Sequence, residues 1–389
     1  MTALAIFSKG RTAVSGSKDG RIILWDIYSG DKRSNFKVTR EPVTCIAISP
    51  DDNRLLVGTE KGALLMIVPT TGQVLWQVKE TDRVNSVAFS PDGNFVLATG
   101  PAKRFAMRDA STGKIVQMYQ GHFFGVHTAA FANDGRRVVS SGGDQTVKEW
   151  DAATGKLLMT YNGHSGNVTA VAVSPDGRLM LSGGTDQKLI LWELQSGRQL
   201  RVLSGHSDLI NGVCFSPDSQ YIYSGSGDAT LRKWHIPTAS ELGRMHGNQD
   251  GEWITTTPDG YYTKSPEGNN LVHYVIPGIF ETYAYEQFEE LFHKPQIVKK
   301  RLEGCVNCGK PSPGLSQPPQ LDLRKHRSVE ITQAQTYSLN LKTVSNNLVK
   351  VVRVFVNGKP AMEVPVNAKE GELSLNIPLF SGANRITAI

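Results

Sequence analysis

The sequence predicts an all-β protein: a ring of seven repeated sheets, then a short helical segment, a linker rich in proline and glycine, and a small β-sandwich. Two repeated patterns predict the ring. A Gly-His pair precedes an apolar run at three places, and its histidines, His122, His164 and His206, are 42 residues apart. A tryptophan followed by Asp, Glu or His closes four copies, at Trp25, Trp150, Trp192 and Trp234.

Other copies keep the same frame without these residues. Ile67 and Arg108 stand where the tryptophan is expected, so the steps between copies are 42, 41, 42, 42 and 42 residues. A turn of the Ser-Pro-Asp-Gly type, such as Ser174–Gly177, marks the copies as well. Thr257–Gly260 indicates a seventh copy, with Val275 in the tryptophan position. The ring is therefore predicted to span about residues 1–280.

Each copy has the pattern of four short strands separated by turns. In the fifth copy the strands are VTAVAVS, RLMLSGG, KLILWEL and RQLRVLS. The first strand is apolar on both faces, which is expected of a strand between two neighbouring sheets. One such sheet cannot cover both of its faces alone, so the copies are predicted to stack around a ring, which leaves no large exposed edge.

These motifs resemble the WD-repeat β-propeller family over about residues 1–280. In that family a histidine, a serine, an aspartate and the tryptophan form a hydrogen-bonded tetrad. The resemblance implies three complete tetrads: His122, Ser140, Asp144 and Trp150; His164, Ser182, Asp186 and Trp192; and His206, Ser224, Asp228 and Trp234. The first copy offers Ser15, Asp19 and Trp25.

The histidines have two interpretations, structural or chemical. Buried polar groups need hydrogen-bond partners, and a tetrad that ends on an indole N–H supplies them. A metal site would need three or four converging ligands, whereas these histidines occur once per copy. The structural role is favoured. Three copies lack the full set and are expected to be less rigid; their residues are Val57, Lys61 and Ile67; Ala98, Ala102 and Arg108; and Ser265, Asn269 and Val275.

The residues after the ring divide into three parts. Residues 281–302 place Tyr285, Phe288 and Leu291 near helical spacing before Pro295, which predicts a short helix. Residues 303–320 are rich in proline and glycine and are predicted to be a linker. Residues 321–389 alternate apolar and polar residues, typical of an immunoglobulin-like sandwich, here truncated.

A second resemblance covers the overall arrangement. The stretch from Trp253 to about Leu302, followed by an Ig-like module, is similar to bacterial WD-repeat proteins that end in a caspase-like peptidase domain. That domain would follow Ile389, so any peptidase activity is expected outside these residues. The rival is a propeller enzyme with a channel active site, but the predicted inner strands VTCIAIS, VNSVAFS and VTAVAVS carry no converging acids or metal ligands.

Charge and cysteine content limit the other classes of function. The net charge is +6; the part from Glu281 onward carries 14 − 10 = +4 and the rest 28 − 26 = +2, without the dense patch that nucleic-acid binding requires. Nucleic-acid binding is therefore disfavoured. No apolar run of membrane-spanning length and no signal peptide is present, which favours a cytoplasmic protein.

Cys305 and Cys308 form a single CxxC. It could be half of a zinc site completed by His293 or His326, but the second pair is missing. A pair of thiols in the linker is the favoured interpretation. Cys45 and Cys214 lie in apolar runs, and a reducing compartment is expected. No cofactor and no metal are predicted.

Phe123 and Phe124 follow a Gly-His pair where two other copies have Ser-Gly and Ser-Asp. Exposed aromatic residues are effective interface anchors, so Phe123 and Phe124 are predicted to bind a protein or peptide. The peptidase domain expected after Ile389 is one candidate partner. The alternative is that one ring packs on the neighbouring copy. Lys18 and Thr185 are weaker candidates on the same face. The sequence thus predicts a protein-interaction scaffold or sensor.

Overall fold

The computed structural model describes most of the propeller and parts of the remaining chain. The described residues are 2–248, 250–271, 274–275, 282–283, 292–306, 308, 320–323, 336–356, 359–378 and 386–388. The chain divides into two compact units, one of residues 1–258 and 296–308, the other of residues 259–295 and 309–389. The first unit therefore ends its continuous part earlier than the predicted boundary at residue 280.

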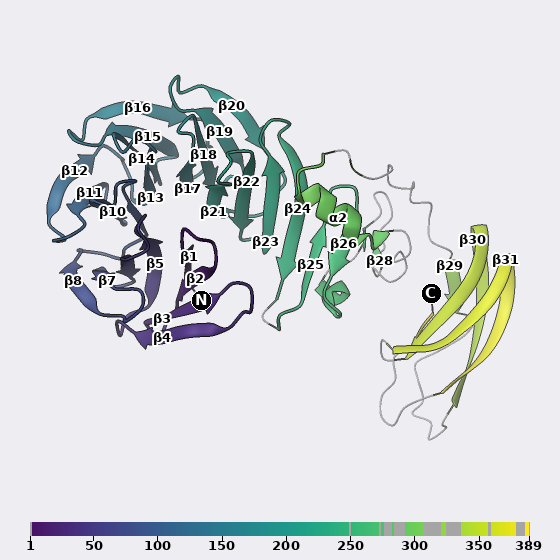
Figure 1. Ribbon diagram of the computed structural model, residues 1–389. Coiled ribbons are helices and arrows are strands. Elements are labelled where there is room, and N and C mark those ends of the chain that lie inside the picture. The colour runs from purple at the N-terminus through teal and green to yellow at the C-terminus, as the bar shows by residue number, and fades with distance from the viewer. Residues whose placement is uncertain are drawn as a thin grey trace. The chain divides into compact units, whose positions relative to one another are not determined.

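Six antiparallel sheets follow one another in the first unit and are arranged as the blades of a propeller (Figure 1). Blade one contains β1 (Ala3–Ile6), β2 (Thr12–Gly16), β3 (Arg21–Asp26) and β4 (Lys32–Lys37). Blade two contains β5 (Val43–Ile48), β6 (Leu55–Thr59), β7 (Ala63–Ile67) and β8 (Val74–Lys79). Blade three contains β9 (Ser86–Phe89), β10 (Phe95–Thr99), β11 (Arg104–Asp109) and β12 (Ile115–Gln120).

The second half of the propeller repeats the pattern. Blade four contains β13 (Val126–Phe131), β14 (Arg137–Gly142), β15 (Thr146–Asp151) and β16 (Leu157–Asn162). Blade five contains β17 (Val168–Val173), β18 (Leu179–Gly184), β19 (Leu189–Glu193) and β20 (Gln199–Leu203). Blade six contains β21 (Ile210–Phe215), β22 (Tyr221–Ser226), β23 (Thr230–His235) and β24 (Ser240–Gly247), and β25 (Trp253–Thr256) pairs with β24. The four-stranded unit of each copy is as predicted.

The Ser-Pro-Asp-Gly turns join the first two strands of a blade. In blade five, Ser174 Oγ accepts a hydrogen bond from the Leu179 N–H at 2.9 Å and donates to Asp176 at 2.6 Å. Gly177 has φ +69°, a left-handed conformation that glycine adopts without steric cost. The turn thus satisfies its own polar groups and sets the start of the second strand.

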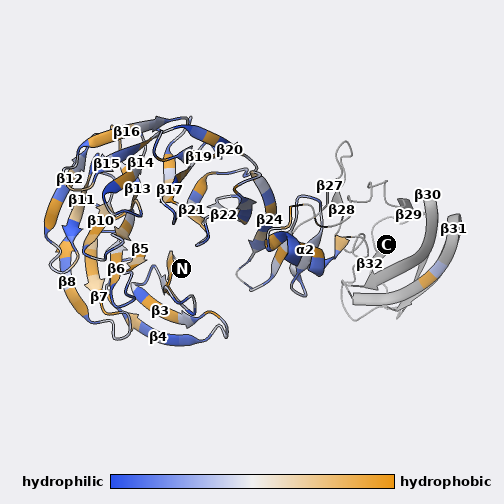
Figure 2. Ribbon diagram, turned by 45° about the horizontal axis from the view of Figure 1, so that its top comes forward, coloured by the Kyte–Doolittle hydropathy of each residue, from blue (hydrophilic) through white to orange (hydrophobic). Residues whose placement is uncertain are grey.

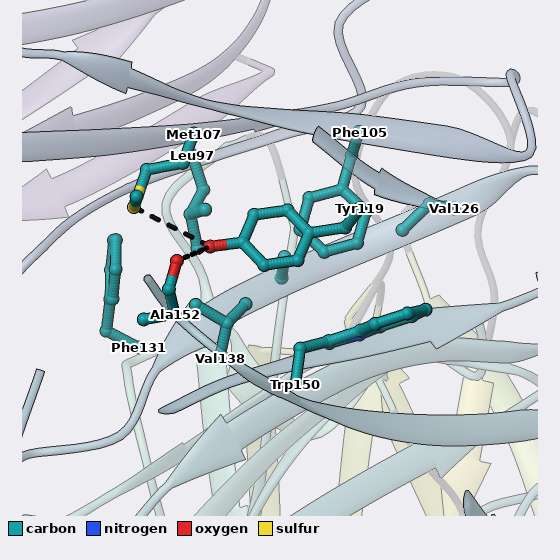
Figure 3. Packing of buried hydrophobic residues seen from close by; sticks show 10 residues of the cluster. Leu97, Phe105, Met107, Tyr119, Val126, Phe131, Val138, Trp150 and Ala152 are labelled. Carbon is teal, nitrogen blue, oxygen red and sulfur yellow. Dashed lines mark hydrogen bonds between the residues drawn. The ribbon is translucent and has the colours of Figure 1, made fainter. Parts of the chain in front are cut away.

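Apolar side chains fill the spaces between neighbouring blades, which places orange residues on the facing sheets in Figure 2. Figure 3 shows the cluster between blades three and four. Phe105 and Tyr119 stack with ring centroids 4.6 Å apart, and Trp150 meets both rings edge-on. The Tyr119 hydroxyl donates to the Ala152 carbonyl at 2.8 Å, so its one polar atom is satisfied in the core. The core therefore lies between blades, as the stacked-copy prediction requires.

The prediction of seven blades is wrong, because the described residues form six. The residues that lead into the expected seventh copy form β25, which pairs antiparallel with β24 from Gly247↔Trp253 to Arg244↔Thr256. They extend the outer edge of blade six instead of starting a new sheet. Val275 lies in β27 (Tyr274–Val275), which pairs with β28 (Thr282–Tyr283). The edge of β24 offers unpaired backbone N–H and C=O groups, and β25 has few apolar residues to pack in a blade of its own. Pairing with β24 therefore satisfies the backbone hydrogen bonds of β25 without a new sheet.

The helical segment differs from the prediction in its bounds. Helix α2 (Pro295–Leu302) begins at the proline that was expected to end a helix, because proline suits the first helical position, where no N–H bond is needed. Tyr285, Phe288 and Leu291 lie outside the described residues. A 3-10 helix (Gly268–Leu271) and β26 (Tyr262–Lys264) precede this region.

The C-terminal part of the second unit contains one described sheet. It consists of β29 (Gln320–Leu323), β30 (Thr336–Val356), β31 (Lys359–Pro378) and β32 (Ile386–Ala388), with β29 and β32 both pairing with β30. A sandwich needs a second sheet, and the strands described after residue 320 do not include one. The Ig-like sandwich therefore stays a prediction, and most of the predicted linker lies outside the described residues.

Candidate functional site

Three hydrogen-bonded tetrads link neighbouring strands of blades four, five and six. In blade five, His164 Nδ1 donates to the Asp186 carboxylate at 3.0 Å, and its Nε2 accepts from Ser182 Oγ at 2.8 Å. The Trp192 indole N–H donates to the same Ser182 oxygen at 2.8 Å. The same bonds connect the other two predicted sets, His122–Ser140–Asp144–Trp150 and His206–Ser224–Asp228–Trp234.

The tetrad histidines are buried and are held in the neutral form. Burial lowers the pKa of His164, and the hydrogen bond that His164 donates to Asp186 only partly opposes this. Burial raises the pKa of Asp186, but hydrogen bonds from His164 and from the Ser165 N–H outweigh it, so the net shift is downward. The pair is therefore a neutral imidazole bonded to an ionised carboxylate, an arrangement that needs no external ligand.

Each tetrad aspartate also fixes the turn that follows the Gly-His pair. The Asp186 carboxylate accepts from the Ser165 N–H at 3.0 Å, and Asp144 accepts from the Phe123 N–H at 3.0 Å. The tetrad therefore anchors, through one backbone bond, the segment that carries Phe123 and Phe124.

The first copy has only part of this network. The Trp25 indole donates to Ser15 Oγ at 2.7 Å. Asp19 instead bonds the Ser17 hydroxyl and the Arg21 N–H, and it is exposed. Asp19 thus holds its own turn and does not join Ser15 and Trp25.

The copies without tetrads are stabilised in two ways. In blade two, Val57 and Ile67 are fully buried in an apolar cluster. In blade three, Arg108 takes the tryptophan position and bonds Glu80 Oε1 through Nε at 3.0 Å and Nη2 at 2.6 Å. Sequence reasoning missed Glu80; a buried arginine in the tryptophan position was the signal that an acid must lie nearby.

Phe123 and Phe124 are the most exposed aromatic pair among the described residues, with 72% and 62% of their surfaces accessible. Neither ring is buried against the neighbouring blade. Gly143 makes room for Phe124, because a Cβ on Gly143 would lie 3.2 Å from the Phe124 Cβ. The two rings therefore stand on an anchored turn and face solvent.

Lys18 and Thr185 are also exposed, each in the turn between the second and third strands of its blade. Val126 pairs with Gly142, so the turn before β13 and the turn after β14 lie at the same end of a blade. Lys18, Thr185 and the Phe123–Phe124 turn therefore share one face of the propeller. No described contact joins them to each other.

The opposite end of the blades contains a shallow hollow lined by residues of blades two to five. Its walls are inner-strand ends and Ser-Pro-Asp turns: Ile48, Pro50, Phe89, Ser90, Pro91, Phe131, Asn133, Val173, Ser174 and Pro175. Three prolines, four other apolar residues, two serines and one asparagine form this lining, and the surface that they expose to the hollow is more polar than apolar. It holds none of the acids or metal ligands that a hydrolytic site would use.

Cys305 and Cys308 form a disulfide, which corrects the expectation of two free thiols. His293 stacks on Tyr262 with centroids 5.1 Å apart, and His326 lies outside the described residues. Within the described ranges, no group of three potential ligands could hold a metal ion. No described helix is long and apolar enough to cross a membrane.

Comparison with known proteins identifies the repeats. The family model "WD domain, G-beta repeat" matches residues 1–26, 72–103, 113–151, 155–193 and 197–235. Blade two, which lacks tetrad residues, is the one that the matches largely omit.

Curated relatives share part of the propeller. The meiotic recombination protein rec14 of Schizosaccharomyces pombe is 33% identical over 105 residues, covering 27% of this chain and 35% of that protein. The WD repeat-containing protein SL1-17 of Schistosoma mansoni is 31% identical over 118 residues, 30% of this chain and 39% of that protein. The human angio-associated migratory cell protein is 27% identical over 111 residues, which cover 28% of this chain and 25% of that protein. The chain thus spans about a quarter to two fifths of these eukaryotic relatives.

Proposed function

We propose, because this chain belongs to the WD-repeat family of β-propellers, that its propeller is a protein-interaction scaffold that binds a partner protein or peptide on the Phe123–Phe124 face. WD-repeat proteins generally act by binding other proteins on a rigid ring of loops. The recognition site assigned to this chain is the turn after His122.

The observation that carries the proposal is the exposure of two adjacent phenylalanines on a fixed turn. Their accessible fractions of 72% and 62% expose apolar surface that favours coverage by a partner. The bond from the Phe123 N–H to Asp144 holds the turn in place, so binding costs less ordering entropy than a mobile loop would. Aromatic side chains held this way are typical hot-spot residues.

The sequence, rather than the structure, supports a proposal about the longer protein to which this scaffold belongs. The resemblance of the stretch from Trp253 to about Leu302 supports a place in a regulatory protein that carries a caspase-like domain. In that setting the Phe123–Phe124 turn would bind the peptidase domain of the same protein in a resting state, in the cytoplasm. The lining of the hollow includes no acidic residue, histidine or cysteine that could act as a general base or hold a metal ion, which favours binding over catalysis. The net charge of +6 is small and gives nucleic acid no concentrated basic surface.

The test is the double variant Phe123→Ser/Phe124→Ser. Proteins cross-linked to the full chain are quantified by mass spectrometry for the parent and the variant, and the affinity of any partner found is then measured with purified components. We expect partner affinity to fall by roughly 30-fold, the hot-spot scale, with an unchanged melting temperature.

The matched control is Leu157→Ser/Leu158→Ser on the outer strand β16. These two adjacent apolar residues are exposed by 41% and 48% but lie away from the Phe123–Phe124 turn. Equal loss of partners in both double variants would mean that any exposed apolar pair binds these partners. Unchanged partner binding by Phe123→Ser/Phe124→Ser would show that this turn is not the binding site.

A further inference from the structure

Blade six carries an exposed apolar row on the face that is not covered by blade five. Gly212, Gly225, Leu231 and Met245 are direct cross-strand neighbours on β21, β22, β23 and β24. Leu231 is 47% exposed and Met245 is 44% exposed. We call these four residues the glycine–leucine row.

The same row in blade five is a packing surface for the next blade. Its members are Ala170, Gly183, Leu189 and Leu203. Leu189 and Leu203 are 0% and 4% exposed. A Cβ on Gly183 would lie 2.5 Å from Ile210 and 3.3 Å from Val213, both on the inner strand β21 of blade six. The glycine is needed there because the neighbouring strand lies against the backbone.

Blades one and two use the same arrangement. A Cβ on Gly16 would collide with Val43 and Ile46 of blade two, and one on Gly58 with Val84 of blade three. Gly16 and Gly183 are each covered by two β-branched residues at i and i+3 of the next inner strand. Gly58 is covered by Val84, which lies two residues before β9. Gly225 keeps the glycine of this interface, yet a Cβ there would meet no atom within 4 Å.

Helix α2 covers only the adjacent row of the same face. The Lys233 ammonium donates to the Leu302 carbonyl at 2.6 Å, and the Tyr221 hydroxyl to the Glu303 carbonyl at 3.3 Å. Gly243, paired with Lys233, faces the Leu302 side chain. The helix therefore shields the row next to the glycine–leucine row and leaves that row open.

A polar residue directly after a buried valine marks the register of this interface in blades two, three and five. The Thr44 hydroxyl donates to the Val84 carbonyl at 2.6 Å, and the Asn85 amide to the Val126 carbonyl at 3.0 Å, in each case one blade further on. Thr169 bonds the Ile210 carbonyl in the same way. Asn211 occupies this position in blade six and is exposed.

Blade one presents the opposite wall of the interface. Leu4 and Ile6 are 55% and 58% exposed, although Ile46 and Ile48, their equivalents in blade two, pack against blade one. Blades one and six are the two ends of the series of blades (Figures 1 and 2). In a second copy of this chain, blade one and blade six each have one face packed on the next blade of that copy. Neither blade could therefore cover the glycine–leucine row and the Leu4–Ile6 surface at the same time. A projecting hairpin with two apolar faces can.

We propose that the glycine–leucine row binds a β-hairpin donated by a partner protein. One strand of that hairpin carries β-branched aliphatic residues at i and i+3, which cover Gly225 and Leu231, and its backbone carbonyl accepts from Asn211. Its other face covers Leu4 and Ile6. This surface lies apart from the Phe123–Phe124 turn and would hold a second partner or a second segment of the same partner.

The probe is the β21–β22 hairpin of this chain, residues 207–227, carried on a soluble fusion protein, because it is the hairpin that covers this row on blade five. Its binding to the full chain is measured by fluorescence anisotropy. We expect saturable binding that Leu231→Asp weakens at least about tenfold. Gly225→Ala should also weaken it while leaving the melting temperature unchanged, since the methyl group meets only open space until a strand docks. Leu158→Asp, at 48% exposure on β16, is the matched control.

Three results would overturn the proposal. Absence of saturable binding would show that the row takes no hairpin. Equal binding by the parent and Leu231→Asp would place the hairpin elsewhere. Self-association of the chain that Leu231→Asp abolishes, or hydrogen-exchange protection of residues 210–214 without the probe, would show that a second copy or this chain itself covers the row.

Discussion

At the residue scale, a histidine, an aspartate and a serine in hydrogen-bond contact are also the parts of a hydrolytic triad, and the tetrads show why they are not one here. Ser182 Oγ already accepts from the Trp192 indole and donates to His164, so its proton and a lone pair are in use. Both the serine and the tryptophan are buried, with exposures of 0% and 2%. A nucleophile with no access to substrate can only stabilise the blade.

The first prediction concerns this tryptophan. Trp192→Ala should lower the free energy of unfolding by about 3–5 kcal/mol, since it opens a cavity and removes a donor from Ser182. Urea unfolding followed by circular dichroism measures it. Trp25→Ala should cost less, because Trp25 is less buried and its Ser15 has no histidine partner. A Trp192 variant as stable as the parent would contradict the structural role.

The second prediction is acid sensitivity. The pKa of His164 is lowered in the folded protein by burial, so the unfolded chain binds more protons as the pH falls below its ordinary value of 6.5. The contribution of the neutral form is therefore complete above that pH and is lost on acidification. The lowered pKa of Asp186 acts in the same direction at lower pH. Melting temperatures should fall between pH 7.5 and 5.5, and less steeply in His164→Asn. A drop of the same size in both proteins would place the titrating groups elsewhere.

At the scale of elements, blade three shows how one contact replaces a tetrad. Arg108 has 8% of its side chain exposed and bonds Glu80, which belongs to the segment between β8 and β9. Its third donor reaches the Gly113 carbonyl at 2.9 Å. The guanidinium thus connects the turn between β11 and β12 to the loop before β9, in the position where blades one, four, five and six have tryptophan.

The third prediction is a double-mutant cycle on this pair. Glu80→Ala should destabilise the protein by roughly 1–3 kcal/mol because it leaves a buried guanidinium partly unpaired. Arg108→Met should remove most of this penalty, so the double variant should be more stable than Glu80→Ala alone. Thermal unfolding of the four proteins gives the coupling energy. Additive effects would mean that the ion pair contributes nothing specific to blade three.

Elements were predictable where a local pattern determines them. Apolar residues that alternate with polar ones between turn residues predict the strands of blades four to six. The start of α2 and the pairing of β25 have no such local pattern. Proline can begin a helix as well as end one, and the sequence around Pro295 does not distinguish the two. Strand β25 was expected to open a new blade, but a strand has no local signal for its partner, and the free edge of β24 decided the pairing.

At the scale of the whole molecule, the period near 42 residues fixed the blade unit but not the number of blades. A repeat count assumes that every copy folds alike, whereas the first strand of the seventh copy, β25, pairs with the edge of β24. The missing tetrad residues do not explain this difference, because blade two also lacks them and still forms a four-stranded sheet. The candidate site was predictable in part. Phe123 and Phe124 stand out against Ser165 and Gly166 in the sequence. The glycine–leucine row is recognised only once the strands are paired and no blade of the described residues is found against it.

The last prediction separates two sources of rigidity in the propeller. The sequence predicted that blades two and three, without tetrads, are the less rigid ones. The structure shows blade two flanked on both sides, with Leu56, Leu64 and Met66 at 0% exposure, whereas Leu4 of blade one and Leu231 of blade six are 55% and 47% exposed. Local opening is easiest where few apolar contacts are lost.

Hydrogen exchange should therefore be faster in β1 and β22–β23 than in β6 and β7, although blade six has a complete tetrad and blade two has none. Mass spectrometry of native-state exchange on the full chain resolves these strands. Faster exchange in β6 and β7 would show instead that the tetrad sets blade stability and that coverage by neighbours is secondary. Binding of the hairpin probe should slow exchange in β22 and β23 and leave β6 unchanged, because only the end blades have a face left to cover.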